Sequence, residues 1–424
     1  MHRAISWGAA LVVVVGCSGV TEGNPPPPPP PNPLAPTAAF ASAGDGQWAI
    51  AGLPTPDPLQ VTVVSATGVG VKDVDVSWVV MPGGGSVVPL AGGKTDANGR
   101  ASATWTMGPV PGVQRIEARV GRLPTVSFGA TAIEPPPGQI AFLTDERDLA
   151  VARGDGQDAK VVLAGPNLVT QALSPDGTRI AFARGGSRRA VEIYVVNVDG
   201  RGVVRLTTND VYDGDPAWSP DGQRLVFARA TGPRDNDRTA LWIMDADGGS
   251  PRQLTAPDSL TFDSRPDWSP DGAWIGYQSS GVTEATALWQ IRPDGTDRRA
   301  VPGLGGGDGH HELLRWSPDG TRLAFRTTRW QADPFEGPAD LAVMRPGGTE
   351  LQRLTMDAAV GDFAWSPDGT QLVFQCGDGG TFPIGDLCLI SRDGTRRLRL
   401  ARGVGGYGPS WSVELPLFPD RGRP

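Results

Sequence analysis

The sequence is poor in cysteine, histidine and helix-favouring runs. Three cysteines and three histidines in 424 residues leave few candidates for a metal centre or for proton transfer. Basic residues gather in no stripe and the formal net charge is −8, so we expect no nucleic-acid partner. Glycine (58 residues) and proline (41 residues) are abundant instead, and short segments with valine, isoleucine and tryptophan alternate with turns. This pattern predicts an all-β chain of two or three domains.

Residues 1–17 have the features of an export signal. Arg3 gives a positive start, and the apolar run from Ile5 to Val15 is too short to span a bilayer as a permanent helix. The run ends in VVGC, which resembles the bacterial lipobox and implies lipidation of Cys17. An ordinary secretory signal with an incidental cysteine is the alternative. Ser18 in the next position resembles the sorting signal for the outer membrane, so the resemblance implies a lipid-anchored protein of the bacterial cell envelope.

Residues 18–37 are expected to be a linker. Seven consecutive prolines, from Pro25 to Pro31, favour a polyproline II helix that rises ~3.1 Å per residue, so this part alone spans about 22 Å. A stiff spacer directly after a lipid anchor would hold the folded domains away from a membrane surface.

Cys376 and Cys388 are the cysteines that remain after Cys17. They occupy two strand-like runs, FQC and DLCLI, that are separated by GDGGTFPIGD. Neighbouring strands with a loop of this length can place the two cysteines opposite each other, within disulfide reach. An exported protein meets an oxidising compartment, so we predict a disulfide. Metal binding is the alternative, and it would need further soft ligands.

Residues 38–133 predict an antiparallel β-sandwich of the immunoglobulin type. Strand-like segments such as LQVTVVSA, VDVSWVV and GRASATWTMG alternate with the turn clusters MPGGGS and TDANG. Alternation places Trp78 and Trp105 on inward faces, so both are expected in the core. The order GDGQWAIAGLPTPDPLQVTVV, VKDVDVSWVV, KTDANGRASATWTMG and IEARV resembles the bacterial immunoglobulin-like group-1 (Big-1) domain. That resemblance implies a stalk or spacer, sometimes an adhesive one.

One phrase occurs five times with small changes between residues 172 and 374, at a spacing of 45 to 50 residues; RWSPDGTRLAF is an example, and the first copy has Leu173 in place of tryptophan. Within each copy SPDG suits a tight turn, because proline presets φ, aspartate bonds to nearby amides and glycine ends the turn. Each copy reads as four strands, which is the blade of a β-propeller. The aspartates of the phrase therefore predict a structural role, and they are Asp176, Asp221, Asp271, Asp319 and Asp368.

The two ends of the array predict six blades. GQIAFLT from Gly138 reads as the second strand of a copy that lacks its first, and GPSWS from Gly408 reads as a first strand without the rest. We expect the strand around Trp411 to complete the blade begun at Gly138, which would close the ring and leave no open edge. The propeller is thus predicted over residues 138–412, followed by a tail over residues 413–424.

The repeated WSPDGxxIAF, followed by a DG turn and RLT, resembles the PD40, or WD40-like, repeat of the TolB family of six-bladed periplasmic propellers. The resemblance spans about residues 139–412 and implies a binding role. It stops short of the family's N-terminal α/β domain, which this sequence replaces with the immunoglobulin-like unit. Members of that family are also soluble periplasmic proteins and not lipoproteins, so membership of the Tol system does not follow.

The candidates for chemistry are few. Acidic clusters at Tyr212 and Asp245 suit calcium, but neither completes a twelve-residue EF-hand loop, and we expect no cofactor. His310 and His311 lie in GGGDGHHELL; propeller lyases that resemble this repeat use several converging histidines, whereas solvated loop histidines are the expectation here. The sequence contains no G-x-S-x-G elbow for nucleophilic hydrolysis.

Long loops between the second and third strands of their blades are the predicted recognition surface. They begin near residues 230, 328 and 377 and carry Trp330, Phe335 and Phe382, which either contact a partner or pack into the rim. We therefore predict a monomeric, non-catalytic envelope protein whose propeller binds a protein or a glycan. The alternative is a polysaccharide-acting enzyme with His310 or His311 and nearby carboxylates at the mouth of the propeller.

Overall fold

The computed structural model describes residues 35–412 except 145, 166, 187–190, 233–237, 257–260, 282–284, 305–308, 332–338, 357–359, 377–385 and 402–406. The signal and lipidation site at Cys17, the proline run, Phe335, Phe382 and the tail lie outside the described residues. Strands dominate the described chain and its helical content is one short 3₁₀ turn, Ala91–Gly93, so the all-β prediction is confirmed. No helix among the described residues is both long and apolar enough to cross a membrane.

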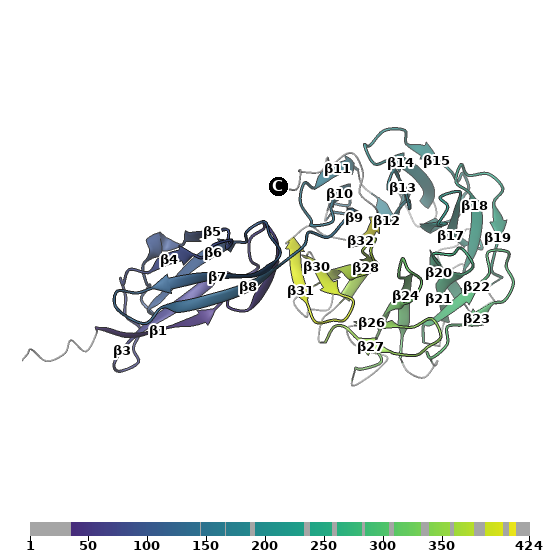
Figure 1. Cartoon of the computed structure of the whole chain (residues 1–424). Helices are drawn as coiled ribbons and strands as arrows, with labels where there is room; N and C mark the ends of the chain where they lie inside the picture. The colour runs from purple at the N-terminus through teal and green to yellow at the C-terminus, as the bar shows by residue number, and fades with distance from the viewer. Residues whose placement is uncertain are drawn as a thin grey trace, which may run out of the picture.

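The N-terminal part consists of two four-stranded sheets that face each other (Figure 1). The first sheet has the order β1 (Pro36–Ala43), β3 (Leu59–Ser65), β6 (Arg100–Thr106) and β5 (Ser86–Pro89). The second has the order β2 (Gln47–Ile50), β8 (Val126–Ile133), β7 (Gly112–Arg119) and β4 (Ser77–Val80).

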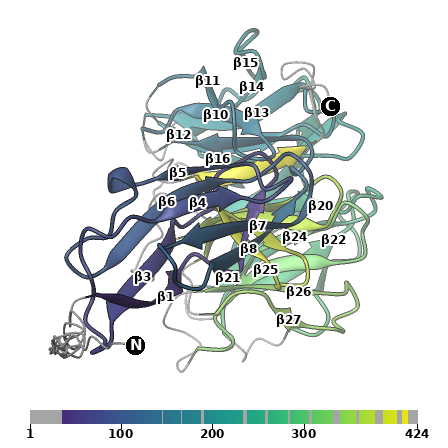
Figure 2. The same ribbon diagram turned by 60° about the vertical axis from the view of Figure 1, so that its left-hand side comes forward.

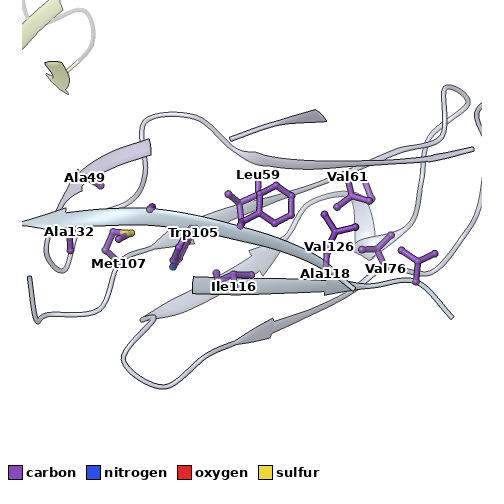
Figure 3. Packing of buried hydrophobic residues seen from close by; sticks show 14 of the residues in the cluster. Ala49, Leu59, Val61, Val76, Trp105, Met107, Ile116, Ala118, Val126 and Ala132 are labelled. Atoms are coloured by element: carbon purple, nitrogen blue, oxygen red, sulfur yellow. The ribbon is translucent and has the colours of Figure 1, made fainter. Parts of the chain in front are cut away.

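Alternation of side chains builds the core between these sheets. In β3 every second residue from Leu59 is buried, as expected for a strand with one face on a core. Trp105 is fully buried at the centre of the cluster (Figure 3), and its indole Nε1 donates to the Gly84 carbonyl at 2.6 Å. Trp78 is partly buried and packs on Phe128, with 5.6 Å between ring centroids. Both tryptophans thus contribute to the core.

The sandwich differs from the predicted one at its first strand. β1 begins at Pro36, two residues before the expected boundary, and β2 pairs with β8 in parallel. The chain crosses from one sheet to the other at Gly44 and Gly46, whose φ values are +83° and +73°, a region that favours glycine. The expectation of a purely antiparallel sandwich was therefore wrong, because the first strand is split between both sheets.

The C-terminal part consists of six four-stranded antiparallel sheets arranged around a ring (Figure 1). We number these ring sheets 1 to 6 in chain order, each with a first strand at the centre. The first strand of ring sheet 1 is β32 (Tyr407–Ser412), from the end of the region. The first strands of ring sheets 2 to 6 are, in order, β12 (Leu168–Leu173), β16 (Asp213–Trp218), β20 (Thr261–Trp268), β24 (His311–Trp316) and β28 (Val360–Trp365).

The remaining strands of each ring sheet follow outward from the first. The second strands of ring sheets 1 to 6 are β9 (Gln139–Leu143), β13 (Arg179–Gly185), β17 (Arg224–Ala230), β21 (Ile275–Gly281), β25 (Leu323–Thr327) and β29 (Gln371–Cys376). The third strands are β10 (Leu149–Arg153), β14 (Val191–Asn197), β18 (Thr239–Asp245), β22 (Ala287–Ile291), β26 (Asp340–Met344) and β30 (Asp386–Ser391). The outermost are β11 (Lys160–Leu163), β15 (Val204–Arg205), β19 (Arg252–Gln253), β23 (Arg299–Ala300), β27 (Gln352–Arg353) and β31 (Arg397–Ala401).

Ring sheet 1 combines the two ends of this region. β32 pairs antiparallel with β9, with Trp411 opposite Ile140 and Ser412 opposite Gln139. The Trp411 indole also donates to the Pro137 carbonyl at 2.8 Å. The last strand of the chain therefore covers the inner edge of β9, whose backbone groups would otherwise lack partners.

A network of three hydrogen bonds fixes the SPDG turn. In ring sheet 3 the Ser219 hydroxyl donates to the Asp221 carboxylate at 2.5 Å, the same carboxylate oxygen accepts the Gln223 amide at 3.0 Å, and Ser219 Oγ accepts the Arg224 amide at 2.9 Å. The same three bonds recur at Asp176, Asp271, Asp319 and Asp368. The hydroxyl and the amide hold the pKa of the Asp221 carboxyl below its usual value.

The repeated phrase also joins neighbouring ring sheets. Arg179 of ring sheet 2 lies 4.6 Å over the ring of Trp218 in ring sheet 3, and Arg224 lies 5.1 Å over the ring of Trp268 in ring sheet 4. Each arginine follows the turn of one copy and each tryptophan precedes the turn of the next. Such cation–π contacts favour one orientation of adjacent sheets.

The N-terminal sandwich packs against the ring rather than only being tethered to it (Figure 2). Ile50 of β2 lies in one buried cluster with Leu389 and Leu398 of ring sheet 6, and Trp48 packs at its margin. The guanidinium of Arg396 lies 4.6 Å over the Trp48 ring. An apolar contact of this kind restrains the angle between the two parts.

Candidate functional site

The first strand of every ring sheet carries an irregularity opposite its second strand. The register shifts lie between Leu168 and Thr170, Gly214 and Ala217, Ser264 and Asp267, Glu312 and Arg315, Val360 and Phe363, and Tyr407 and Ser410. A β-bulge leaves one residue out of the ladder and redirects its side chain. These shifts place six backbone irregularities around the ring axis, and those of ring sheets 2 and 6 begin one residue further from the turn than the other four.

One position in these bulges lies three residues before the tryptophan of each copy, or before Leu173, which takes the place of tryptophan in ring sheet 2. We call these six residues the channel ring, and they are Thr170, Asp215, Arg265, Leu313, Asp362 and Gly408. Four of them have positive φ, between +51° and +58°. For residues other than glycine this conformation is uncommon, and it persists where the surrounding structure enforces it.

Hydrogen bonds and an ion pair connect members of the channel ring that are far apart in sequence. Arg265 Nη1 lies 2.8 Å from Asp362 Oδ1, across 97 residues. The Arg265 amide lies 3.4 Å from Asp215 Oδ2, and the Asp215 amide donates to Thr170 Oγ1 at 3.1 Å. A charged contact therefore joins ring sheets 4 and 6 in front of ring sheet 5. The Arg265 and Asp362 side chains are 36 % and 27 % exposed.

Burial and Arg265 have opposite effects on the pKa values of the Asp215 and Asp362 carboxyls. Burial raises the pKa of the Asp215 carboxyl, although Arg265 opposes this effect. Burial also acts to raise the pKa of Asp362, but Arg265 and Arg326 outweigh it and lower that pKa below its ordinary value. The carboxylate of Asp362 in turn raises the pKa of Arg265. The ion pair is thus charged at neutral pH, in surroundings that favour it over the isolated charges.

A third carboxyl, that of Asp267, lies on the central strand β20 beside the channel ring. Asp267 Oδ2 accepts the Trp316 amide at 2.9 Å, which ties ring sheet 4 to ring sheet 5. Burial raises the pKa of Asp267 to about 6, and the nearby charge of Arg315 opposes that rise. Glu312 of the next central strand, β24, lies 3.6 Å from Arg326. The centre of the ring therefore holds several carboxylates, of which Asp362 and Glu312 lie close to guanidinium groups.

The comparisons with known proteins place this ring in a family. Residues 138–415 match the TolB beta propeller domain. The chain belongs to the TolB β-propeller family. An uncharacterized protein of Agrobacterium fabrum is 32 % identical over 171 residues, which cover 40 % of this chain and 54 % of that protein. A TolB homolog of Chlorobium luteolum is 32 % identical over 165 residues, covering 38 % and 34 %.

Among solved structures, TolB from Acinetobacter baumannii superposes with a TM-score of 0.55 at 19 % sequence identity, covering 72 % of this chain and 80 % of that one. A likeness at this level of identity shows the fold. The chain spans about half or less of the length of the two relatives above. The propeller region is therefore the part of the molecule for which the family relationship is established.

The expectation that both histidines are solvated in a loop was wrong for His311. This residue belongs to the central strand β24 and is 1 % exposed. Its Nδ1 lies 2.9 Å from Thr327 Oγ1, and its ring meets Phe325 edge-on at 6.0 Å. His310 directly before the strand is partly buried, and its Nδ1 accepts the Thr286 amide at 3.1 Å. The strand begins at His311 itself, which draws this residue into the propeller.

Of the predicted recognition aromatics, Trp330 is the one within the described residues. It is partly buried and packs against the cluster of ring sheet 5 that contains Phe325. The guanidinium of Arg353, from the outermost strand of the same sheet, lies 5.5 Å over its ring. Of the two alternatives for this residue, the structure shows the one in which the indole packs into the rim.

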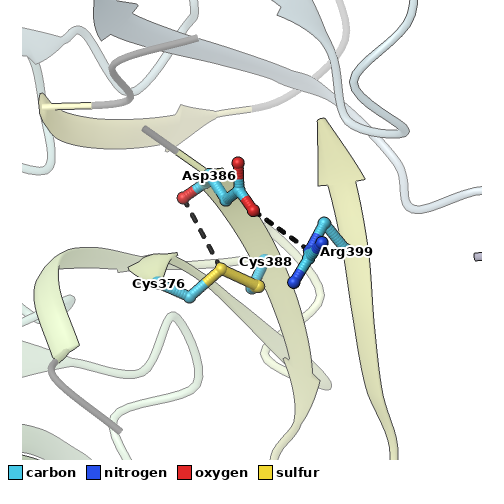
Figure 4. The surroundings of a disulfide bond; sticks show 4 residues. All are labelled: Cys376, Asp386, Cys388 and Arg399. Atoms are coloured by element: carbon cyan, nitrogen blue, oxygen red, sulfur yellow. Dashed lines mark hydrogen bonds and ion pairs between the residues drawn. A yellow bond between two sulfur atoms is a disulfide. The ribbon is translucent and has the colours of Figure 1, made fainter. Parts of the chain in front are cut away.

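Cys376 and Cys388 form a disulfide between β29 and β30, with 5.9 Å between their Cα atoms (Figure 4). They are not directly opposite, because Cys376 faces Asp386 and Cys388 faces Phe374 in the strand register. The bond is therefore a diagonal one across the second and third strands. Asp386 beside it is bound by Arg399 of the outermost strand at 3.1 Å. The group stabilises the base of the long loop that connects these strands.

The acidic cluster at Tyr212 has a different use from metal binding. Asp213 is fully buried, and its carboxylate is held by Arg229 through two hydrogen bonds of 2.7 and 2.8 Å. Asp247 of the cluster at Asp245 accepts the Gly249 amide at 2.8 Å within a turn. Within the described ranges, no group of three or more acidic, histidine or cysteine side chains is arranged to hold a metal ion.

The channel ring was missed at the sequence level, although a signal was present. The position three residues before tryptophan holds aspartate, arginine, leucine, aspartate and glycine in the five tryptophan-containing copies. It varies inside a phrase that otherwise repeats. When the residues around one position repeat and the residue at that position does not, the position is expected to lie where the copies meet, at the centre of the ring, and to make a different contact in each copy.

Proposed function

We propose that this protein is a non-catalytic, lipid-anchored envelope protein whose immunoglobulin-like N-terminal part presents a six-bladed propeller to a protein or glycan partner. The observation that carries the binding role is the family match over residues 138–415. Rigid rings of this kind position residues for recognition without requiring a reactive group.

The channel ring is the proposed centre of recognition. Its charged members already satisfy one another, with Arg265 and Asp362 in contact at 2.8 Å. Both side chains remain partly exposed, so charged groups of a partner can exchange hydrogen bonds with them. Binding through exchanged polar contacts favours specificity over raw affinity.

The N-terminal features support presentation at a membrane. The VVGC sequence that ends at Cys17 and the seven prolines from Pro25 precede the sandwich directly. The contact between the sandwich and ring sheet 6 adds a fixed angle after the stiff spacer. Anchor, spacer and sandwich would then hold the mouth of the propeller at a defined height and orientation.

The enzymatic alternative required His310 or His311 to converge with carboxylates at the channel. His311 is buried against Thr327 and Phe325, and His310 binds the Thr286 amide. These contacts favour the binding role.

The binding role is tested by capture with the full chain. Immobilised protein that carries Cys17→Ser, to keep it in solution, is exposed to detergent extract of the producer's envelope, and the retained molecule is identified and purified. We expect that molecule to bind the full chain directly and to lose affinity for the variant Arg265→Gln. Val113→Ser is the matched control, because Val113 is 70 % exposed on the sandwich. Equal binding to both variants, or no retained molecule, would contradict the proposal.

The anchor is tested separately by fractionation of cells. Replacement of Cys17 with serine removes the only thiol that the lipobox resemblance assigns to lipid, so we expect the protein to move from the membrane fraction to the soluble fraction. Stable anchoring needs more than one acyl chain, and the modification supplies it. Unchanged membrane association of the Cys17→Ser protein would refute the anchor and leave the binding role untouched.

A further inference from the structure

Ring sheet 2 contains a guanidinium group, that of Arg184, for which the described residues provide no hydrogen-bond or ion-pair partner. Arg184 lies near the end of β13 and is partly buried. Within the described part of the chain it makes no hydrogen bond and no ion pair. Its Nη2 reaches the segment that joins ring sheets 1 and 2, where a Cβ on Gly165 would lie 3.1 Å away. Residues 187–190, which follow directly, read SRRA and contain no acidic side chain.

The neighbouring ring sheet shows what this arginine lacks. Arg229 occupies the equivalent position of ring sheet 3, since Arg184 pairs with Leu168 in the strand register and Arg229 pairs with Asp213. There the buried carboxylate of Asp213 neutralises the guanidinium through two short hydrogen bonds. In ring sheet 2 the carboxylate is replaced by the apolar side chain of Leu168. At equivalent positions, Arg229 therefore has a carboxylate on the central strand and Arg184 has none there.

A cavity lies beside Arg184. It has a volume of about 320 Å³, and its wall includes Arg184, Arg205, Glu192 and Tyr194. Gly185 and Gly186 contribute no side chains to fill it. This size is at the lower end of the range of small-molecule sites, roughly 300–1,000 Å³.

The one carboxylate in the wall is already bound. Glu192 is the cross-strand neighbour of Arg184, but its oxygens accept from Arg205 Nη2 at 2.8 Å, from the Asn209 amide at 2.7 Å and from the Thr207 hydroxyl. The Glu192 side chain is 3 % exposed, and the guanidinium of Arg205 offsets its charge. Two arginines and one satisfied carboxylate leave the wall with a net positive charge.

We propose that this cavity binds a small ligand through a carboxylate group, with Arg184 as its principal partner. The planar guanidinium matches a carboxylate in the two-point geometry that Asp213 and Arg229 show in the next sheet. The site lies on ring sheet 2 and its lining contains no member of the channel ring, so it is independent of the proposed recognition centre. A carboxylate at the end of a peptide and one on a sugar share this chemistry.

The test is titration of the full chain with acetate, with D-glucuronate, with the dipeptide Gly-Gly and with neutral D-glucose, followed by ligand-detected NMR. We expect saturable binding of the carboxylates and no binding of glucose. Tighter binding of D-glucuronate would identify the ligand as a sugar acid, and tighter binding of Gly-Gly would identify it as the end of a peptide. Arg184→Gln should weaken binding about tenfold or more, because a hydrogen-bonded charge is lost. Arg201→Gln is the matched control, since Arg201 is an exposed arginine of the same ring sheet.

A second variant tests the missing anion itself. Leu168→Asp supplies the carboxylate that ring sheet 3 has, so it should abolish ligand binding while Arg184 is still present. Leu168→Asn has the same shape without the charge and should retain binding; thermal unfolding of both shows whether they fold. If Leu168→Asp does not fold, Arg184→Gln alone decides. No saturable binding of any carboxylate at about 10 mM, or equal binding to Arg184→Gln and wild type, would overturn the proposal.

Discussion

The ion pair between Arg265 and Asp362 gives the sharpest test of how the centre of the ring is held. Arg265 Nη1 and Asp362 Oδ1 are 2.8 Å apart, and the two side chains are 36 % and 27 % exposed. The pair is therefore intermediate between an exposed and a fully buried ion pair. Two unit charges about 4 Å apart attract by about 1 kcal/mol in water and about 4 kcal/mol at an effective dielectric constant of 20. After the loss of hydration we expect a coupling free energy of about 1–2 kcal/mol.

The single variants should differ in cost. Asp362→Asn leaves Arg265 close to Asp215, whose Oδ2 lies 3.4 Å from the Arg265 amide. Arg265→Gln instead leaves Asp215 and Asp362 without their shared cation. We therefore expect Arg265→Gln to lower the free energy of unfolding more than Asp362→Asn does.

The assay is a double-mutant cycle by urea unfolding, with tryptophan fluorescence as the probe. The matched control is the cycle of Lys94 and Asp75, which are only 2.6 Å apart but 51 % and 83 % exposed; its coupling should stay below about 0.5 kcal/mol. High salt should reduce the Arg265–Asp362 coupling only in part, because the pair is shielded from ions. A coupling within about 0.3 kcal/mol of zero, or a larger cost for Asp362→Asn, would refute this reasoning.

Three further predictions concern the ring. Burial raises the pKa of Asp267 to about 6, so ionisation of this carboxyl opposes folding above that pH. At pH 8 we therefore expect Asp267→Asn to be more stable than wild type by up to about 3 kcal/mol, and near pH 4 we expect no difference. A variant that is less stable than wild type at pH 8 would contradict the burial argument. The Ser219 hydroxyl is the chief cause of the lowered pKa of Asp221, so the Asp221 carboxylate stabilises the fold at a pH above its pKa in the unfolded chain. Asp221→Ala should lower the free energy of unfolding by about 1–2 kcal/mol at pH 7, and by less as the pH falls below 4. An equal loss at pH 7 and pH 3 would argue against the role of the charge. Cys376 and Cys388 close a loop with a sequence separation of 12, so replacement of both by serine should lower the free energy of unfolding by about 3 kcal/mol; two free thiols in the non-reduced protein would disprove the bond.

Much of the chain could be predicted from its sequence because the decisive interactions are local. The SPDG turn depends on bonds from Ser219 to Asp221 and Arg224, all within five residues, so each copy folds alike wherever it stands. Alternating side chains in β3 likewise follow from the geometry of one strand. These local rules gave the all-β class and the repeat that defines the family.

The same rules could not reach pairings between distant segments. The parallel pairing of β2 with β8 joins residues more than 80 positions apart, and nothing in QWAI distinguishes a parallel partner from an antiparallel one. His311 read as a loop residue because glycines precede it, whereas its burial depends on Thr327 and Phe325 of the next strand. The diagonal geometry of the disulfide depends on the register between β29 and β30.

The sequence by itself thus determined the local units of this protein: strands, turns and the phrase that repeats them. The tertiary structure alone decided which side chains share the centre and the rims, because the arrangement of the sheets brings together Arg265 and Asp362 from sheets that are not neighbours. It also decided that Arg184 lies opposite Leu168 of the central strand, whereas Arg229 lies opposite Asp213 and binds its carboxylate. The physical reason is that charges interact through space, and the distances between them are set by the assembly of the sheets rather than by the order of the residues.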